Sequence, residues 1–254
     1  MLDFLINALK IIFLLGFLIL IHECGHFFVA RLCKVRVNEF SIGFGKILFK
    51  KVKNDTQYSL RLIPLGGYVN LEGEDTESEK EGSFSKASIP KRMAIILAGG
   101  LTNIIFAIIV FFILSMIVIN TSGENITFFD SLKNSIFNLG DFISSIFESL
   151  KMLFTGKVSI NDFMGPVGIS EVVVKTTSLQ NYIYLLSLIS MSLGITNLLP
   201  FPALDGGKFV LLIIEAIRGK KLSEKVETNI QLIGFAFLII LSLYVAYNDI
   251  LRIL

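Results

Sequence analysis

The chain has 254 residues, of which 53% are hydrophobic and only 17% are charged. Because an average soluble domain carries roughly 25% charged residues, this composition argues against a soluble globular protein, excludes a disordered one and indicates a protein in a lipid bilayer. Two cysteines are too few for a disulfide scaffold, and a net charge of +2 offers no electrostatic footprint for nucleic acid.

Four segments are apolar enough to cross a membrane as helices. A spanning helix needs roughly 20 mostly apolar residues, and the segments at about 4–30, 93–119, 181–204 and 228–250 meet that requirement. The first segment lacks a basic start and a small-residue cleavage site, so we interpret it as a retained span and not as a signal peptide. The sequence therefore predicts an α-helical, polytopic membrane protein with four transmembrane helices.

The two longer connections between these spans differ in kind. Residues 35–70 combine β-forming side chains with glycine, which predicts short strands joined by turns. In residues 130–156 the apolar side chains repeat with helical spacing and charged residues interrupt them. That pattern predicts an amphipathic helix on the membrane surface before the third span, and not a further span.

The distribution of lysine and arginine predicts the orientation. Loop 31–92 carries twelve basic residues and the short loop 206–227 carries five, whereas the longer stretch 120–175 carries only four. Basic loops stay in the cytoplasm, so loops 31–92 and 206–227 are expected there. Both termini are then expected outside, and the first and third spans both end at the cytoplasmic face.

An H-E-x-x-H motif, His22-Glu23-Cys24-Gly25-His26, stands at the end of the first span. The i, i+4 spacing places both imidazoles on one helical face, where they can bind one Zn²⁺ while the glutamate acts on a water molecule. These are the only histidines of the chain, and ionisable residues within a membrane are costly and functional by default. The alternative is an interfacial cluster that only caps the helix, a task that Lys or Arg performs at lower cost.

A zinc site needs a third protein ligand, and without a further histidine this must be a carboxylate or a thiolate. Asp205 is the candidate, because it follows the third span and is expected at the same cytoplasmic depth as the histidines. In the alternative interpretation Asp205 only caps a helix that begins near Gly206. Cys24 is expected on the opposite side of its helix. Cys33 is the other candidate ligand, although a buried apolar thiol is the more common role of such a residue.

With these motifs in place, the sequence resembles the site-2 protease family of intramembrane zinc metalloproteases, peptidase family M50. The closest likeness is to its bacterial regulator-of-sigma-E protease branch. The resemblance covers nearly the whole chain and rests on five runs: Leu20–Arg31, Phe40–Lys46, Ile63–Val69, Gly165–Ile169 and Asn197–Gly207.

The resemblance implies a role for each site residue. His22, His26 and Asp205 would ligate one zinc ion, and Glu23 would be the general base. Asn197 would help to hold the substrate strand, and a membrane-associated β-hairpin that includes Gly43, Phe44 and Gly45 would pair with it.

The family also implies an activity and a location. The chain would be a zinc-dependent endopeptidase that cleaves transmembrane segments of substrate proteins, in regulated intramembrane proteolysis at a bacterial inner membrane. Since the motif is expected at the cytoplasmic end of a span, the cut is expected near the cytoplasmic side. The partners would be the lipid bilayer and a transmembrane protein or peptide, such as an anti-sigma factor or a remnant signal peptide, and no nucleic acid.

Two departures from the family pattern stand out. Members of this branch usually carry one or two PDZ domains between the second and third spans, but here residues 120–164 are too few for one, so we expect a single protease domain without PDZ domain. Gly100 stands where the family usually has proline. A non-catalytic membrane adaptor and a zinc transporter are the alternative functions. The protease is favoured because the chain retains all four site residues and gathers its polar groups at one depth.

Overall fold

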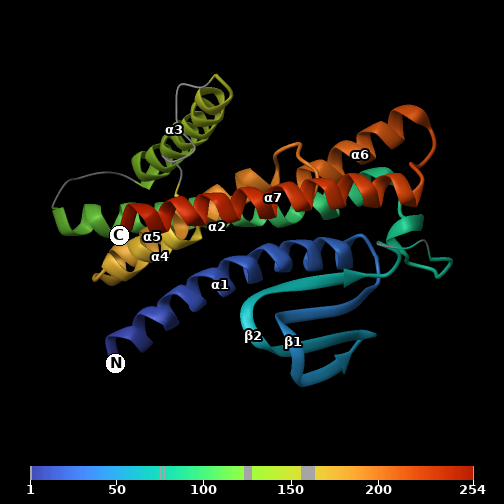
Figure 1. Ribbon diagram of the computed structural model, residues 1–254, viewed down its shortest axis with the longest axis horizontal. Coiled ribbons are helices and arrows are strands. Elements are labelled where there is room, and N and C mark those ends of the chain that lie inside the picture. The colour runs from blue at the N-terminus through green and yellow to red at the C-terminus, as the bar shows by residue number, and fades with distance from the viewer. Residues whose placement is uncertain (1, 75, 77, 123–127, 156–163, 254) are drawn as a thin grey trace. The chain divides into compact units, whose positions relative to one another are not determined.

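The computed structural model describes the whole chain except residues 1, 75, 77, 123–127, 156–163 and 254. The described part is mostly helical and contains one hairpin of two long strands (Figure 1). In chain order the elements are α1 (Leu2–Leu32), β1 (Val37–Lys53), β2 (Thr56–Leu71), the 3₁₀ helix η1 (Phe84–Lys86), α2 (Ile89–Ser122), α3 (Phe128–Phe154), α4 (Pro166–Lys175), α5 (Leu179–Asn197), α6 (Asp205–Arg218) and α7 (Glu224–Ile253).

Three helices of the described chain are long and apolar enough to cross a membrane, namely Asp3–Leu32, Ile89–Ile117 and Glu224–Arg252. They coincide with the first, second and fourth predicted spans. The third, predicted at 181–204, is not confirmed. Its helix α5 ends at Asn197, begins with polar residues such as Gln180 and Asn181, and is not among the three. Pro200 follows shortly after, and a proline disfavours helical backbone in the residue before it.

Strands are present where the sequence predicts them, within residues 35–70, but they are two long strands of 17 and 16 residues and not several short ones. β1 and β2 are rich in β-branched and aromatic residues, which suit a pleated surface. Asn54 and Asp55 form the two-residue turn between them, and their φ angles of 51° and 60° match the type I′ turn, whose twist suits a hairpin. The sequence interpretation did not identify this turn.

The hairpin bends sharply at Gly43 and Gly45. Their φ angles of +86° and +80° lie in the left-handed region that glycine adopts without steric cost, and the strand register shifts there. Residues 39–42 consequently pair with 67–70 on one side and with 57–60 on the other. The bend thus folds a two-stranded hairpin into a broader sheet.

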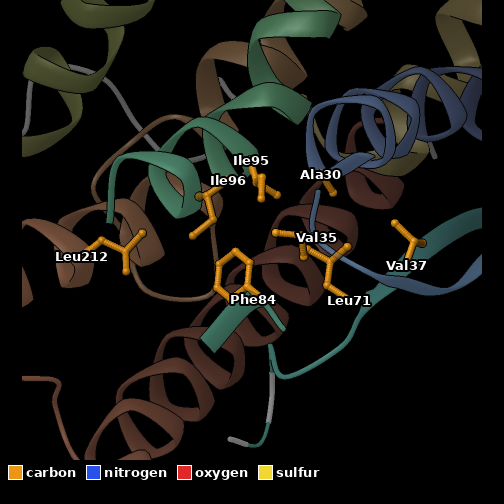
Figure 2. Close-up of a cluster of buried hydrophobic side chains, with 8 residues drawn as sticks. All are labelled: Ala30, Val35, Val37, Leu71, Phe84, Ile95, Ile96 and Leu212. Atoms are coloured by element: carbon orange, nitrogen blue, oxygen red, sulfur yellow. The ribbon is translucent and has the colours of Figure 1, made fainter. Parts of the chain in front are cut away.

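The chain divides into two compact units. Unit 1 consists of Met1–Ile104 and Ser192–Phe235, and it holds the hairpin and every predicted site residue. Its core joins the end of α1 to the hairpin, to the start of α2 and to α6 (Figure 2). The buried side chains of this core are Ala30, Val35, Val37, Leu71, Phe84, Ile95, Ile96 and Leu212.

Unit 2 consists of Ile105–Met191 and Ala236–Leu254. It contains α3 (Phe128–Phe154), which overlaps the helix predicted at 130–156, of which residue 156 lies outside the described residues. That this helix is amphipathic and lies on a membrane surface stays a prediction. The buried carboxylate of Asp249 on α7 accepts a hydrogen bond of 2.8 Å from the backbone N–H of Gly168, in the first turn of α4. A carboxylate there satisfies a backbone donor that the helix itself leaves unpaired.

Candidate active site

The two imidazoles of the motif and the carboxylate of Asp205 converge on one point. His22 and His26 lie one turn apart on α1, and their Nε2 atoms are 3.1 Å apart. The Oδ2 atom of Asp205 lies 3.1 Å from Nε2 of His22 and 3.4 Å from Nε2 of His26. Tetrahedral zinc with ligand atoms at about 2.0–2.1 Å would separate those atoms by about 3.3 Å. The three atoms therefore have the spacing of a zinc ligand set.

The contacts around these groups turn their potential metal-binding atoms toward one another. Nδ1 of His26 donates to the backbone carbonyl of Ile95 over 2.8 Å, which leaves Nε2 with its lone pair. Oδ2 of Asp205 is buried, and it faces the Nε2 atoms of both imidazoles. A buried carboxylate costs free energy unless it is paired with a cation or coordinates a metal. A cation bound by these three residues would remove that cost, so the donor set fits a zinc ion.

Asp205 reaches this position because it opens α6. It is the first residue of the helix and not the capping residue, which is Leu204. Its carboxylate faces the imidazoles, so the interpretation of Asp205 as only a helix cap does not describe its contacts. Burial alone would raise the pKa of Asp205, but the two neighbouring imidazoles outweigh burial and lower it below its usual value. The carboxylate is therefore ionised, as a metal ligand must be.

Helix α2 approaches the imidazoles closely at Gly99, next to their Nε2 atoms. A Cβ atom there would lie 2.3 Å from Nε2 of His26 and 2.6 Å from Nε2 of His22. Any residue other than glycine would displace the imidazoles from this position. The sequence interpretation missed Gly99 as a site residue. The available signal was the Gly99–Gly100 pair inside an otherwise apolar span.

Glu23 follows His22 on α1, and strand β2 runs beside it. The backbone N–H of Val69 interacts with the Glu23 carboxylate. Further back on α1, a Cβ atom at Gly16 would lie 3.0 Å from the carbonyl oxygen of Pro64. Residues 64–69 of β2 therefore follow α1 from Gly16 to the motif. The sequence did not reveal Val69 as a neighbour of the glutamate, because the contact joins two elements.

The other predicted residues lie in the same unit but outside the His-His-Asp group. Asn197 is the half-buried last residue of α5, on the segment that leads to Asp205. Gly43, Phe44 and Gly45 form the bend of β1, and the ring of Phe44 stacks on Tyr68 with centroids 6.3 Å apart. Cys33 packs against the core of unit 1 and does not join the group of potential metal ligands.

Arg61 of β2 fixes the bend of β1 from inside the sheet. Its guanidinium donates to the carbonyl of Gly45 over 2.8 Å, to Glu39 over 2.7 Å and to the hydroxyl of Tyr68 over 2.7 Å. Burial opposes ionisation of Glu39, but hydrogen bonds from Ser59, Arg61 and Tyr68 prevail and lower its pKa. One cation thus ties both strands to the residues that flank the bend.

Comparison with known proteins adds independent evidence. Residues 10–241 match peptidase family M50. The chain is 30% identical to a candidate zinc metalloprotease of Clostridium acetobutylicum, with 96% of this chain and 97% of the relative aligned. It is 26% identical to the zinc metalloprotease RasP of Shouchella clausii, with 97% and 99% aligned.

Both alignments are longer than the chain itself, at 329 and 414 positions, so both relatives contain stretches with no counterpart here. A candidate zinc metalloprotease of Vibrio cholerae is 48% identical over a shorter stretch, which covers 46% of this chain and 27% of that protein. Because the family match extends over almost the entire chain and includes the motif of His22, Glu23 and His26, the chain belongs to peptidase family M50, the site-2 protease family of zinc metallopeptidases.

Proposed function

We propose that this protein is an intramembrane endopeptidase that cleaves transmembrane segments of substrate proteins. The observation that carries the proposal is the convergence of three metal-ligand atoms beside a glutamate on a helix apolar enough to span a membrane. A zinc ion held by His22, His26 and Asp205 would supply a Lewis acid to the scissile carbonyl and to the attacking water.

Glu23 is the general base in this proposal. It takes a proton from the attacking water and returns it to the leaving nitrogen of the cleaved peptide bond. The backbone N–H of Val69 holds the carboxylate from one side, and the carbonyl of Ile95 fixes the ring of His26 from the other. These contacts keep the catalytic groups in place without occupying the Nε2 atoms.

A transmembrane substrate must be unwound before it is cut, since a helix hides its carbonyls in i→i−4 bonds and bare extended chain is not tolerated in lipid. We propose that the substrate strand pairs with the hairpin at the bend of Gly43, Phe44 and Gly45, by addition of a strand to the sheet. Support comes from the course of β2, which leads along α1 to Glu23. The amide of Asn197, with donors and an acceptor, would bind the unwound backbone.

In the membrane arrangement that we propose, α5 is the third of four spans. It has 19 residues, which at about 1.5 Å per residue reach about 28 Å, close to the roughly 30 Å of a hydrocarbon core. Both termini lie outside a bacterial inner membrane and loops 31–92 and 206–227 lie in the cytoplasm, so the cut falls near the cytoplasmic side. The helix α3 lies on the outer membrane surface, and no PDZ domain interrupts the protease domain. Anti-sigma factors and remnant signal peptides are candidate substrates.

Replacement of the general base tests the proposal. In Glu23→Gln the side chain keeps its shape but cannot take a proton, so cleavage of a transmembrane substrate by purified, zinc-loaded protein should fall by about 10²-fold or more. Zinc content and thermal unfolding should stay at wild-type values. Glu81→Gln makes the same chemical change at an exposed position and should leave cleavage unchanged.

Two outcomes would contradict the proposal. A Glu23→Gln protein that cleaves at the wild-type rate would exclude Glu23 as the base. A wild-type protein with full zinc content that cleaves no transmembrane segment would favour the adaptor or the transporter.

A further inference from the structure

The turn that precedes Asp205 contains a strained residue. Leu204 donates its backbone N–H to the carbonyl of Phe201 over 3.2 Å, which closes a four-residue turn with Pro202 and Ala203 at its centre. Ala203 has a φ angle of +73°. Proline followed by a residue with positive φ is the pattern of a type II turn, where glycine normally takes the second central position. Alanine there carries a steric cost that glycine would not.

Helix α7 holds this turn through Gln231. The side-chain Oε1 of Gln231 accepts a hydrogen bond of 2.6 Å from the backbone N–H of Ala203. Its Nε2 atom is buried and has no hydrogen-bond partner among the described residues. The unpaired Nε2 atom costs free energy. The hydrogen bond from Ala203 to Oε1 is the interaction that compensates for this buried side chain.

A second contact between α7 and the turn comes one turn further along the helix. A Cβ atom at Gly234 would lie 2.4 Å from Cβ of Pro202 and 2.6 Å from its carbonyl oxygen. The backbone of α7 therefore approaches the turn closely enough for Gln231 to reach it. The two contacts involve different residues of the turn and fix it from the same side.

We propose that Gln231 is a positioning residue of the metal site, which holds Ala203 in its left-handed conformation and thereby aims the carboxylate of Asp205. This inference rests on the proposed role of Asp205 as a ligand. The ligand atoms leave little freedom, since Oδ2 of Asp205 lies only 3.1 and 3.4 Å from the two Nε2 atoms. Without the bond from Gln231, Ala203 relaxes toward negative φ, and the carboxylate that follows it shifts.

The test uses the full-length protein loaded with Co²⁺, whose visible absorption reports the ligand set, and measures metal release to a chelator. In Gln231→Leu the release should be about tenfold faster, as expected for the loss of one buried hydrogen bond, and the Co²⁺ bands should shift. Thr228→Val removes a polar group from the same helix and should change neither. Neither readout requires catalysis.

Rescue by glycine distinguishes this role from general support of the fold. Glycine adopts positive φ without help, so Ala203→Gly in the Gln231→Leu background should return release to within about threefold of wild type. Absence of rescue would overturn the proposal. If Gln231→Leu does not fold, Ala203→Val with Gln231 intact should also speed release, because a β-branched residue resists positive φ. Wild-type release by Ala203→Val would then overturn it.

Asp205→Asn separates the two levels of the argument. If this variant keeps the wild-type Co²⁺ spectrum, Asp205 is not a ligand and the proposed function fails. If it loses the metal while Gln231→Leu behaves as wild type, only the positioning role of Gln231 fails.

Discussion

Gly99 has no side chain, and the two imidazoles occupy the space that one would need. Its neighbours on α2 contribute differently: the carbonyl of Ile95 orients His26, and the core residues Ile95 and Ile96 anchor the helix. The candidate ligands themselves come from α1 and α6. A helix that provides none of the candidate ligands thus limits where the two imidazoles of α1 can lie.

The change Gly99→Ala should weaken metal binding by about 10–100-fold, the range seen when residues that orient metal ligands are lost. The added methyl group would lie 2.3 Å from Nε2 of His26, so one or both imidazoles must move. Competition between the protein and a chelator of known zinc affinity measures the effect. Gly140→Ala is the matched control, because a Cβ atom at Gly140 meets nothing within 4 Å. Equal zinc affinity in the two variants would show that the close approach at Gly99 is unimportant.

Whether a residue of the site could be predicted depends on whether its neighbours in sequence already reveal its role. His22, Glu23 and His26 could be predicted because the spacing within one helix already defines the geometry. Asp205 could be predicted because its expected depth matched that of the histidines. Gly99, Val69 and Gln231 could not, because each acts through packing between elements far apart in sequence.

Among the elements, the hairpin carries more internal structure than its length suggests. Two glycines at positive φ bend β1, and Arg61 joins the bend to Glu39 and Tyr68. The guanidinium is planar and donates in several directions at once, a geometry that lysine cannot reproduce. The shape of the edge proposed to receive substrate therefore depends on a single arginine.

Arg61→Lys should lower the kcat/KM for a transmembrane substrate by about tenfold, because a substrate strand paired with a displaced edge is misaligned at the cleavage site. Zinc affinity should not change, since no ligand contacts Arg61. Arg31→Lys is the matched control, as Arg31 makes one exposed hydrogen bond of 3.3 Å, to Asn54. If Arg61→Lys cleaves the substrate at the wild-type rate, the shape of the bend does not control substrate binding.

Whether a segment forms a helix or a strand was easier to predict than the residue at which it ends. Strands within 35–70 followed from residue composition, but the turn at Asn54 and Asp55 lacks the glycine that usually marks a type I′ turn. Helix α5 was predicted through to 204 because its apolar run continues past Asn197, whereas the backbone leaves the helix before Pro200. Hydropathy alone does not register the conformational limit that a proline imposes.

At the scale of the whole molecule, an ion pair ties the start of α2 to α6. The guanidinium of Arg92 donates to both carboxylate oxygens of Glu215, over 2.9 and 2.5 Å, and both side chains are nearly buried. A bidentate pair of this kind specifies geometry as well as charge. Because α6 begins with Asp205, this pair restrains the helix that carries the third candidate ligand.

Orientation in the membrane is open to a direct test with single cysteines. In a background in which Cys24 and Cys33 are replaced by serine, a membrane-impermeant maleimide added to intact cells should label Thr177→Cys. It should label Glu81→Cys only after permeabilisation. The physical reason is the excess of lysine and arginine in loop 31–92. The opposite pattern would invert the topology and move the proposed cut to the outer side.

The division of unit 1 between two separate stretches of sequence has a consequence for evolution. All three candidate ligands lie within Met1–Ile104 or Ser192–Phe235, and the described residues of the intervening stretch add none. Extra residues between Ile105 and Met191 would lengthen a closed loop, and each doubling of loop length costs only about 0.6 kcal/mol in entropy. Insertion or loss of a module in that stretch would therefore cost little entropy and would leave the three candidate ligands in place.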